Sequence, residues 1–156
     1  MIYVLDSSSF RVCGHYFPSR FPTFWDEFNA LVQDGGIISV REVRKELDHI
    51  AHRQHLRDWI DRNKAIFLLA GPQETQFVAQ IFAVQHFQQL IGARQRLAGS
   101  PVADPFIIAS AHVRDACVVT EESFKPNAAR IPNVCDHFGI DCISIEEMME
   151  RENWSF

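Results

Sequence analysis

Short apolar runs that alternate with longer stretches of helical periodicity constrain the fold of this chain more than any other feature. Runs of this length, with no regular alternation of polar residues, are typical of strands buried on both faces of a sheet. The longer stretches between them indicate helices, so the order of elements predicts βαβ units and a parallel sheet. The predicted strands are Ile2–Leu5, Ile37–Ser39, Ala65–Ala70, Ala116–Val119 and Asp141–Ser144. We therefore expect an α/β fold in three layers, with helices on both faces of a central parallel sheet.

Apolar residues at helical spacing predict helices in the connections between these strands. Thr23 is a candidate N-cap of the first firm helix, and residues 11–22, with one glycine and two prolines, are expected to form a loop or a broken helix. The 156 residues contain no internal repeat, low-complexity tract or linker, so one domain spanning residues 1–156 is expected. The expected helices are Thr23–Val32, Val40–Ile50, His52–Asn63, Glu74–Leu90, Ala103–His112, Ile131–Phe138 and a final segment from Ile145.

The composition excludes several classes of protein. Hydrophobic residues make up 47% of the chain and charged residues 22%, as in ordinary globular proteins, and the net charge of −5 argues against non-specific coating of nucleic acid. No run approaches the roughly 20 apolar residues of a membrane helix, and no signal peptide is recognisable, so a cytoplasmic location without membrane contact is expected. The cysteines form no C-x-x-C pair and are expected to be reduced core residues; they are Cys13, Cys117, Cys135 and Cys142.

The first predicted strand ends at an aspartate, Asp6, which is followed by three serines. In open α/β sheets ligands bind in the crevice at the carboxyl ends of the strands, so Asp6 occupies a position suited to a functional acid. The serines can cap a following helix and satisfy free backbone N–H groups beside the carboxylate. Asp6 can equally be a helix N-cap with no further role, and the strand–Asp–Ser pattern alone leaves both interpretations open.

Two candidate acids lie in the helix that follows the second strand. Glu46 comes three residues after Val43 and four before Ile50, on or beside the apolar face, where an unpaired carboxylate is costly to bury. An acid in this position needs a partner, and a metal ion would serve. Glu42 lies one turn earlier on the same face and ranks second, because a solvated acid at the start of a helix is explained by the helix dipole.

Two further acidic positions complete the set. Asp104 opens a strongly apolar helix, where Asp followed by Pro is also a common pairing of N-cap and first helical residue. Glu121 and Glu122 follow a buried strand, and because strand side chains alternate, only one of them is expected to face the crevice. Acids at strand ends and in the following helices would converge in a parallel sheet, and clustered carboxylates favour Mg²⁺ or Mn²⁺.

Four segments of the chain, taken in order, resemble PIN-domain ribonucleases and are most similar to the VapC-type toxins of toxin–antitoxin modules or to a PIN-like relative of them. The segments are Tyr3–Ser8, Ser39–Leu47, Ala103–Ala111 and Val118–Phe124. The resemblance covers essentially the whole chain. It implies a PIN-like fold and a metal-dependent endoribonuclease that hydrolyses RNA phosphodiester bonds.

The family pattern implies a site of four acids, which in this sequence are Asp6, Glu46, Asp104 and Glu122. The three acids other than Glu46 would hold one or two Mg²⁺ or Mn²⁺ ions, and Glu46 would act directly or through water. Glu122 departs from the family, which usually has Asp there, so a role for its neighbour Glu121 stays open. The secondary candidates are Glu42, Glu121, Thr120 and Ser7.

Basic side chains near these acids are expected to contact the RNA. The substrate-binding candidates are Arg41, Arg44, Lys45 and Lys125, and further cations that flank the crevice are Arg94, Arg96 and Arg130. The implied partners are the RNA substrate, an antitoxin protein and a second copy of the chain. Exposed aromatic residues near residues 10–28 are expected to offer a docking surface for a partner helix or for a second copy of the chain.

Three other interpretations of these residues are less favoured. His49, His52 and His55 recur every three residues, but this interval drifts around a helix, so structural or surface histidines are favoured over zinc ligands. The main alternative is a PIN-like module that has lost its chemistry and binds nucleic acid or protein. The sequence argues against this alternative, because all four positions of the site keep a carboxylate. A phosphohydrolase with Asp6 as covalent nucleophile would carry a second aspartate two residues on, where this chain has Ser8.

Overall fold

The computed structural model describes residues 1–91 and 102–156, and in this part of the chain five strands form one sheet. All neighbouring strands pair in parallel, in the order β3-β2-β1-β4-β5. The strands are β1 (Tyr3–Leu5), β2 (Ile37–Val40), β3 (Phe67–Leu68), β4 (Cys117–Val119) and β5 (Cys142–Ile143). The predicted α/β fold with a parallel sheet is confirmed.

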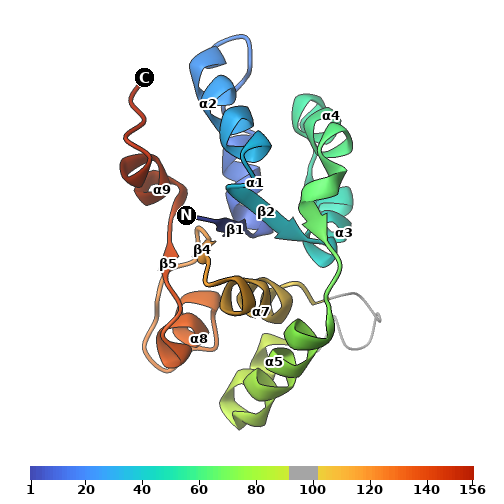
Figure 1. Ribbon diagram of the computed structural model, residues 1–156, viewed down its shortest axis with the longest axis vertical. Coiled ribbons are helices and arrows are strands. Elements are labelled where there is room, and N and C mark those ends of the chain that lie inside the picture. Colours follow the sequence, from blue (N-terminus) through green and yellow to red (C-terminus); the bar gives the residue numbers. More distant parts are fainter. Residues whose placement is uncertain (92–101) are drawn as a thin grey trace.

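Helices lie on both faces of this sheet, as Figure 1 shows. The chain steps from β1 to β2 to β3 in one direction and then returns to β4 and β5, so right-handed connections place its two halves on opposite faces. One face carries α1 (Ser7–Cys13), α2 (Pro22–Gln33), α3 (Arg41–Ile50) and α4 (Gln54–Arg62). The other carries α5 (Pro72–Ala83), α7 (Asp104–Arg114) and α8 (Ile131–Phe138), and α9 (Ile145–Arg151) follows β5.

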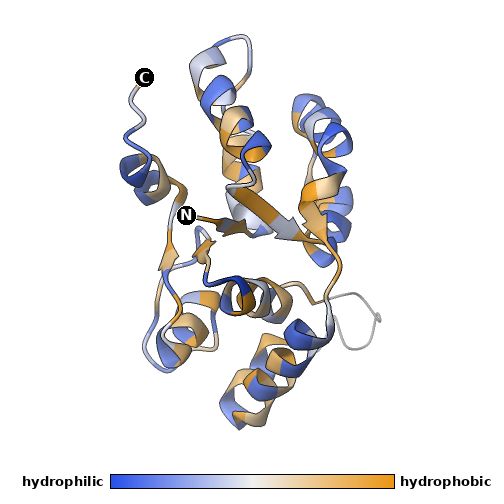
Figure 2. Ribbon diagram, viewed as in Figure 1, coloured by the Kyte–Doolittle hydropathy of each residue, from blue (hydrophilic) through white to orange (hydrophobic). Residues whose placement is uncertain are grey.

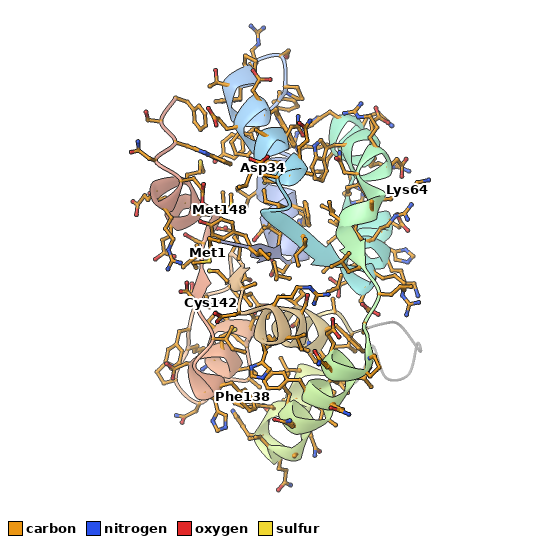
Figure 3. The ribbon with its side chains drawn as sticks, viewed as in Figure 1. Met1, Asp34, Lys64, Phe138, Cys142 and Met148 are labelled. Atoms are coloured by element: carbon orange, nitrogen blue, oxygen red, sulfur yellow. The ribbon has the colours of Figure 1, made fainter. Side chains whose placement is uncertain are left out.

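The sheet is buried between the two helix layers, which explains why its strands read as unbroken apolar runs. Every residue of β1 and β4 is buried. Figure 2 shows apolar residues on the strands and on one side of the helices, and Figure 3 shows the side chains that fill the space between the layers. All four cysteines are free thiols, as predicted, and three of them are buried; the half-buried one is Cys142.

Two helices differ from those predicted. Thr23 is not the N-cap of α2, because Pro22 already forms the first helical residue, a position where the missing N–H of proline costs nothing. The helix predicted over Glu74–Leu90 breaks at Val84, which adopts an extended backbone, and the chain continues as a 3₁₀ helix, η2 (Gln85–Leu90).

The third predicted strand is shorter than expected. Lys64–Ile66 form a 3₁₀ helix, η1, and only two residues remain for β3, which lies at the edge of the sheet. The segment predicted as a loop or a broken helix, residues 11–22, includes the last turn of α1, which starts at the serines after β1 and ends at Cys13. Within residues 1–91 and 102–156, no helix is long and apolar enough to span a membrane.

Candidate metal centre

Asp6 lies directly after β1, at the carboxyl edge of the sheet, and is only 5% exposed. Its Oδ1 accepts a hydrogen bond from the Ser9 N–H at 2.9 Å, so this aspartate is the N-cap of α1. The same carboxylate accepts hydrogen bonds from the Ser8 hydroxyl, at 2.7 Å to Oδ1, and from the Thr120 hydroxyl, at 2.5 Å to Oδ2. Asp6 is therefore a capping residue, and its bonds also hold the carboxylate in place at the strand end.

Glu46 reaches the same edge of the sheet from α3. The Ser7 hydroxyl donates a hydrogen bond to Glu46 Oε2, which joins the start of α1 to the middle of α3. The pKa of Glu46 is raised by burial; the bond from Ser7 and the backbone of Ala103 lower it, and the charges of Asp6 and Glu122 raise it. Both of these acids therefore lie close enough to Glu46 for their charges to act on it.

Asp104 approaches from the opposite helix layer, as the first residue of α7. The N-cap of α7 is Ala103 and no side chain caps this helix, so the interpretation of Asp104 as an N-cap is wrong. Burial, and then the charges of Glu122, Glu46 and Asp6, raise the pKa of Asp104 from 3.8 to about 8. Among the described residues, none donates a hydrogen bond to this half-buried carboxylate.

Glu122, and not Glu121, faces these acids. Glu121 Oε1 accepts a hydrogen bond from the Ile145 N–H at 2.8 Å, at the start of α9. Glu122 Oε2 accepts one from the Ile131 N–H at 3.0 Å, at the start of α8, and its charge acts on Asp104. The structure thus brings the four predicted acids together from two strand ends and both helix layers; this acidic cluster consists of Asp6, Glu46, Asp104 and Glu122.

Glu42 does not belong to the acidic cluster. It was expected to be solvated, but it is only 4% exposed, and its Oε1 lies 3.4 Å from Nη2 of Arg41. Its Oε2 is buried and has no hydrogen-bond partner among the described residues. Glu42 lies in the first turn of α3, where the helix dipole stabilises a negative charge. The nearby guanidinium and this dipole offset part of the cost of burying the carboxylate.

The predicted substrate-binding residues differ in whether their charges are already paired. Arg41 pairs with Glu42, and Nη2 of Arg44 lies 4.0 Å from Asp61. Two other candidates have exposed side chains; they are Lys45 and Lys125. Two of the flanking cations lie outside the described residues; they are Arg94 and Arg96. The third, Arg130, donates a hydrogen bond to the Ser123 carbonyl at 3.5 Å.

The residue types of the acidic cluster fit Mg²⁺ or Mn²⁺, because all four side chains offer carboxylate oxygens. Burial first, and then the charges of the other acids, raise the pKa of Asp104, and a divalent cation would offset the repulsion between the acids. The other three carboxylates already accept hydrogen bonds from protein donors. In the described part of the chain, no three acidic, histidine or cysteine side chains are placed to hold an ion as they stand. Metal binding would therefore require some of these side chains to turn toward the ion.

The three histidines do not gather around a common point. His49 and His52 are exposed, as expected of surface residues. His55 is half-buried, and its ring packs against that of Phe17 with the centroids 5.3 Å apart. Of the aromatic residues near residues 10–28, the large exposed ones are Phe17 and Phe21. The buried ones belong to the core; they are Phe10, Phe24, Trp25 and Phe28.

Two interactions of the acidic cluster were not predicted from the sequence. The serines were expected to cap a helix and to satisfy backbone N–H groups beside the carboxylate, but the particular group was not predicted: Ser8 bridges Asp6 and the Glu121 N–H, which donates to the Ser8 hydroxyl at 3.0 Å. The Ile131 N–H holds Glu122. The first depends on how β1 and β4 align, and the second involves a backbone group that every residue except proline carries, so neither has a signal in the sequence.

Comparisons with known proteins bear on the fold. A family model described as "Domain of unknown function (DUF4411)" matches residues 3–156. A search of curated proteins found no match. Among solved structures, the chain is similar to a chain in the crystal structure of VapBC2 from Rickettsia felis bound to a DNA fragment from their promoter. The TM-score is 0.50 and the sequence identity is 13%, and the match covers 92% of this chain and 98% of that chain. At this identity the similarity concerns the fold alone, and it supports the predicted three-layer α/β architecture.

Proposed function

The chain belongs to the family described as "Domain of unknown function (DUF4411)", and we propose that it is a metal-dependent endoribonuclease that hydrolyses RNA phosphodiester bonds with Mg²⁺ or Mn²⁺. The observation that carries this proposal is the convergence of four carboxylates from four separate segments of the chain at the carboxyl edge of the sheet. This edge is where open α/β sheets bind their ligands. The resemblance to PIN-domain ribonucleases supports the same activity, and a single domain over residues 1–156 in the cytoplasm is part of the proposal.

In this mechanism Asp6, Asp104 and Glu122 would hold one or two ions, and Glu46 would act directly or through a water molecule. The bound ion would supply an activated water and neutralise charge on the phosphate. The chain's own contribution is orientation. Thr120 and Ser8 hold the Asp6 carboxylate at the strand end, and Ser7 holds Glu46 against the start of α1.

Asp104 has a distinct part in this mechanism. Its carboxylate receives no hydrogen bond from the described residues, whereas those of Asp6, Glu46 and Glu122 do. An incoming cation therefore replaces no protein hydrogen bond at Asp104 and relieves its repulsion with the other acids. We expect Asp104 to be the ligand whose loss weakens metal binding most.

The test is cleavage of a mixed RNA pool by the purified protein, with Mn²⁺ and with EDTA. Asp6→Asn and Asp104→Asn should each abolish cleavage, and asparagine still caps α1 at position 6, so the fold should be kept. Glu121→Gln is the matched control, because Glu121 contacts the start of α9 instead of the acidic cluster. Circular dichroism checks that all variants are folded. Cleavage that persists in EDTA or in both aspartate variants would refute the proposal.

A second part of the proposal is that the chain is the toxin of a toxin–antitoxin module, with an antitoxin protein as partner and a second copy of the chain as a further candidate. Its support is the resemblance to VapC-type toxins, together with a similar chain found in a VapBC2 structure. Induced expression in bacteria should arrest growth, and Asp104→Asn should relieve the arrest. Growth that continues despite expression of a folded and active wild-type protein would rule out the toxin role.

The alternative is a catalytically silent PIN-like module that binds nucleic acid or protein. The observation in its favour is that no three side chains in the described residues are arranged as metal ligands, while three of the four acids are engaged with protein donors. Isothermal titration with Mn²⁺ separates the two functions. A folded wild-type protein that takes up no Mn²⁺ and cuts no RNA would favour the silent module.

A further inference from the structure

A basic hollow lies between α1 and the junction of α3 with α4. Its volume is about 350 Å³, and its lining residues are Arg11, His15, Ile50, Ala51, His52, Arg53 and Leu56. Two arginines and two histidines line it, and no acidic residue does. Nη2 of Arg53 lies 3.2 Å from Nδ1 of His15, which holds the two side chains together across the hollow. In a chain with a net charge of −5, this hollow is a local concentration of basic side chains.

The basic hollow adjoins the acidic cluster along two helices. Ser7 on α1 and Glu46 on α3 are hydrogen-bonded at the cluster. Arg11 follows Ser7 by four residues on α1, and Ile50 follows Glu46 by four residues on α3. Side chains four apart share one helix face and lie one turn apart, which is about 6 Å. The basic hollow therefore begins about one helical turn from the bond between Ser7 and Glu46.

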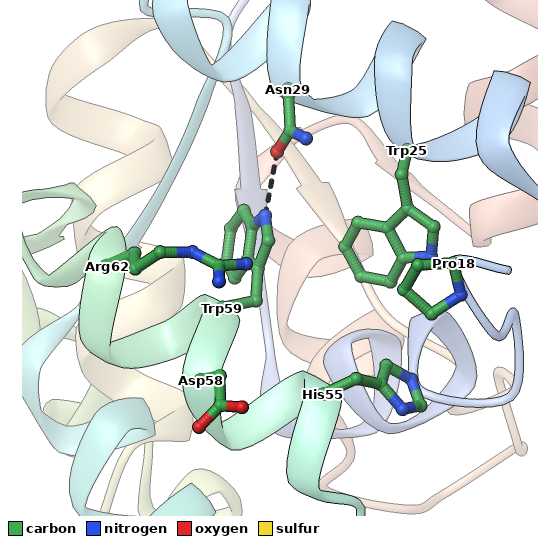
Figure 4. A pocket seen from close by; sticks show the side chains of 7 residues that line it. All are labelled: Pro18, Trp25, Asn29, His55, Asp58, Trp59 and Arg62. Carbon is green, nitrogen blue, oxygen red and sulfur yellow. Dashed lines mark hydrogen bonds between the residues drawn. The ribbon is translucent and has the colours of Figure 1, made fainter.

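An aromatic hollow follows the basic one, and Phe17 connects them. The Arg53 guanidinium lies over the Phe17 ring at 5.1 Å from its centroid, and the His55 ring lies 5.3 Å from the same centroid. Phe17 itself is 44% exposed. The second hollow, drawn in Figure 4, has a volume of about 300 Å³ and is lined by Pro18, Trp25, Asn29, His55, Asp58, Trp59 and Arg62.

The rings of the aromatic hollow are held in place while one polar atom lacks a partner. Trp59 Nε1 donates to Asn29 Oδ1 at 2.8 Å, the bond drawn in Figure 4, and Trp25 Nε1 donates to the Tyr16 carbonyl at 2.5 Å. Nε2 of His55 is buried and has no hydrogen-bond partner among the described residues. A buried nitrogen of this kind costs free energy until a ligand atom bonds to it.

We propose that the two hollows form one track for single-stranded RNA, with backbone phosphates at Arg11, His15 and Arg53 and a base against Phe17 and His55. Grooves of basic residues followed by aromatic rings are the usual means of holding a single strand, because phosphates need cations and unpaired bases need stacking partners. The proposal rests on the proposed nuclease function for the identity of the ligand. It goes beyond that function because it specifies that the bound RNA is single-stranded and which residues it contacts next to the acidic cluster.

Binding is measured by fluorescence anisotropy with labelled single-stranded RNA in EDTA, so that no cleavage occurs and only binding is read. For single-stranded RNA, each phosphate contact adds about 0.7 to the steepness with which the logarithm of the binding constant falls against the logarithm of the salt concentration. The double variant Arg11→Gln/Arg53→Gln should therefore flatten the slope by about 1.4 and weaken binding about 25-fold at 0.1 M salt. The matched control, Arg57→Gln/Lys64→Gln, also removes two charges but lies outside both hollows, and it should change the slope little.

Base stacking is tested separately. Phe17→Ala should weaken binding about fivefold or more, while Phe156→Ala, which removes another exposed ring outside the hollows, should not. Because Trp25 and Trp59 line the aromatic hollow, a bound base should also quench intrinsic fluorescence. An oligonucleotide of the same length without bases should bind the arginines and leave the fluorescence unchanged.

Several results would overturn this inference. They are equal binding by the double variant and its control, a preference for double-stranded over single-stranded RNA, or quenching by an acidic peptide but not by RNA. If the wild type cleaves RNA while the double variant binds and cleaves normally, the track is wrong and the nuclease function stands. If RNA binding depends on Arg11 and Arg53 but no metal ion permits cleavage, the track stands and the nuclease function fails.

Discussion

Replacement of Asp104 by asparagine should stabilise the metal-free protein, because it removes a carboxyl that the fold forces toward its neutral form. The pKa of Asp104 is raised from 3.8 to about 8, and a difference of 8 − 3.8 corresponds to about 6 kcal/mol at 1.36 kcal/mol per unit. The carboxyl is only half-buried and partly screened by solvent, which reduces the expected gain to about 3 kcal/mol.

The sign of the pH dependence follows from the direction of this shift. Between pH 4 and 8 the carboxyl of Asp104 is protonated in the folded chain and ionised in the unfolded one, so the folded state loses stability as the pH rises through this window. Asp104→Asn lacks this loss. The variant and the wild type should therefore have similar stability near pH 4 and differ by about 3 kcal/mol above pH 8.

The assay is urea unfolding in EDTA between pH 4 and 9, followed by circular dichroism. Asp26→Asn, which changes an exposed aspartate on α2, is the control and should not alter the pH profile. Adding Mn²⁺ should then stabilise the wild type, by about 2.7 kcal/mol at 100 times its dissociation constant, but not Asp104→Asn. A wild type that is at least as stable as Asp104→Asn at pH 8.5 in EDTA would refute the conclusion that burial and neighbouring charges disfavour the ionised carboxyl of Asp104.

Three further predictions concern other parts of the structure. Glu122→Gln should reduce Mn²⁺-dependent RNA cleavage at least about 100-fold. Glu121→Gln should keep this cleavage but lower the free energy of urea unfolding by about 1 kcal/mol, because it weakens the start of α9. Equal effects of the two variants on cleavage would contradict the assignment of Glu122 to the acidic cluster. Thr120→Val removes a donor to the buried Asp6 carboxylate and should cost about 1–3 kcal/mol at pH 7, measured by thermal unfolding, and an unchanged melting temperature would show that the bond contributes little. Ile108→Ala, at a fully buried position of α7, should cost about 2–5 kcal/mol in urea unfolding, and a loss below 1 kcal/mol would mean that the core collapses around the cavity.

The order and type of most elements follow from the sequence, because periodicity reports burial directly. A strand covered on both faces has no solvated side, so β1 and β4 read as continuous apolar runs. Boundaries were less predictable. Val84 breaks a helix whose apolar pattern continues past it, and the hydrophobic pattern does not report the backbone conformation of a single residue.

The sequence by itself determined which residues carry acidic groups and that a parallel sheet would bring the strand ends to one edge. It left open whether Asp6 and Asp104 were caps, and which of the adjacent glutamates faced the crevice. Only the structure decided these points. The caps depend on the backbone at the helix starts, where the Ser9 N–H donates to Asp6 and Ala103 is the N-cap of α7. The choice between the glutamates depends on how β4 packs against the helices that follow it, because Glu121 bonds to Ile145 and Glu122 to Ile131.

The tertiary structure alone also revealed the basic and aromatic hollows, since their residues come from α1, α2, α3, α4 and the segments between them. No local pattern marks Arg11 and Arg53 as neighbours, because they are 42 positions apart and meet only when α1 packs beside the junction of α3 and α4. Local periodicity selects the helices and strands of this protein, whereas the position of charged groups in space is set by how those elements pack.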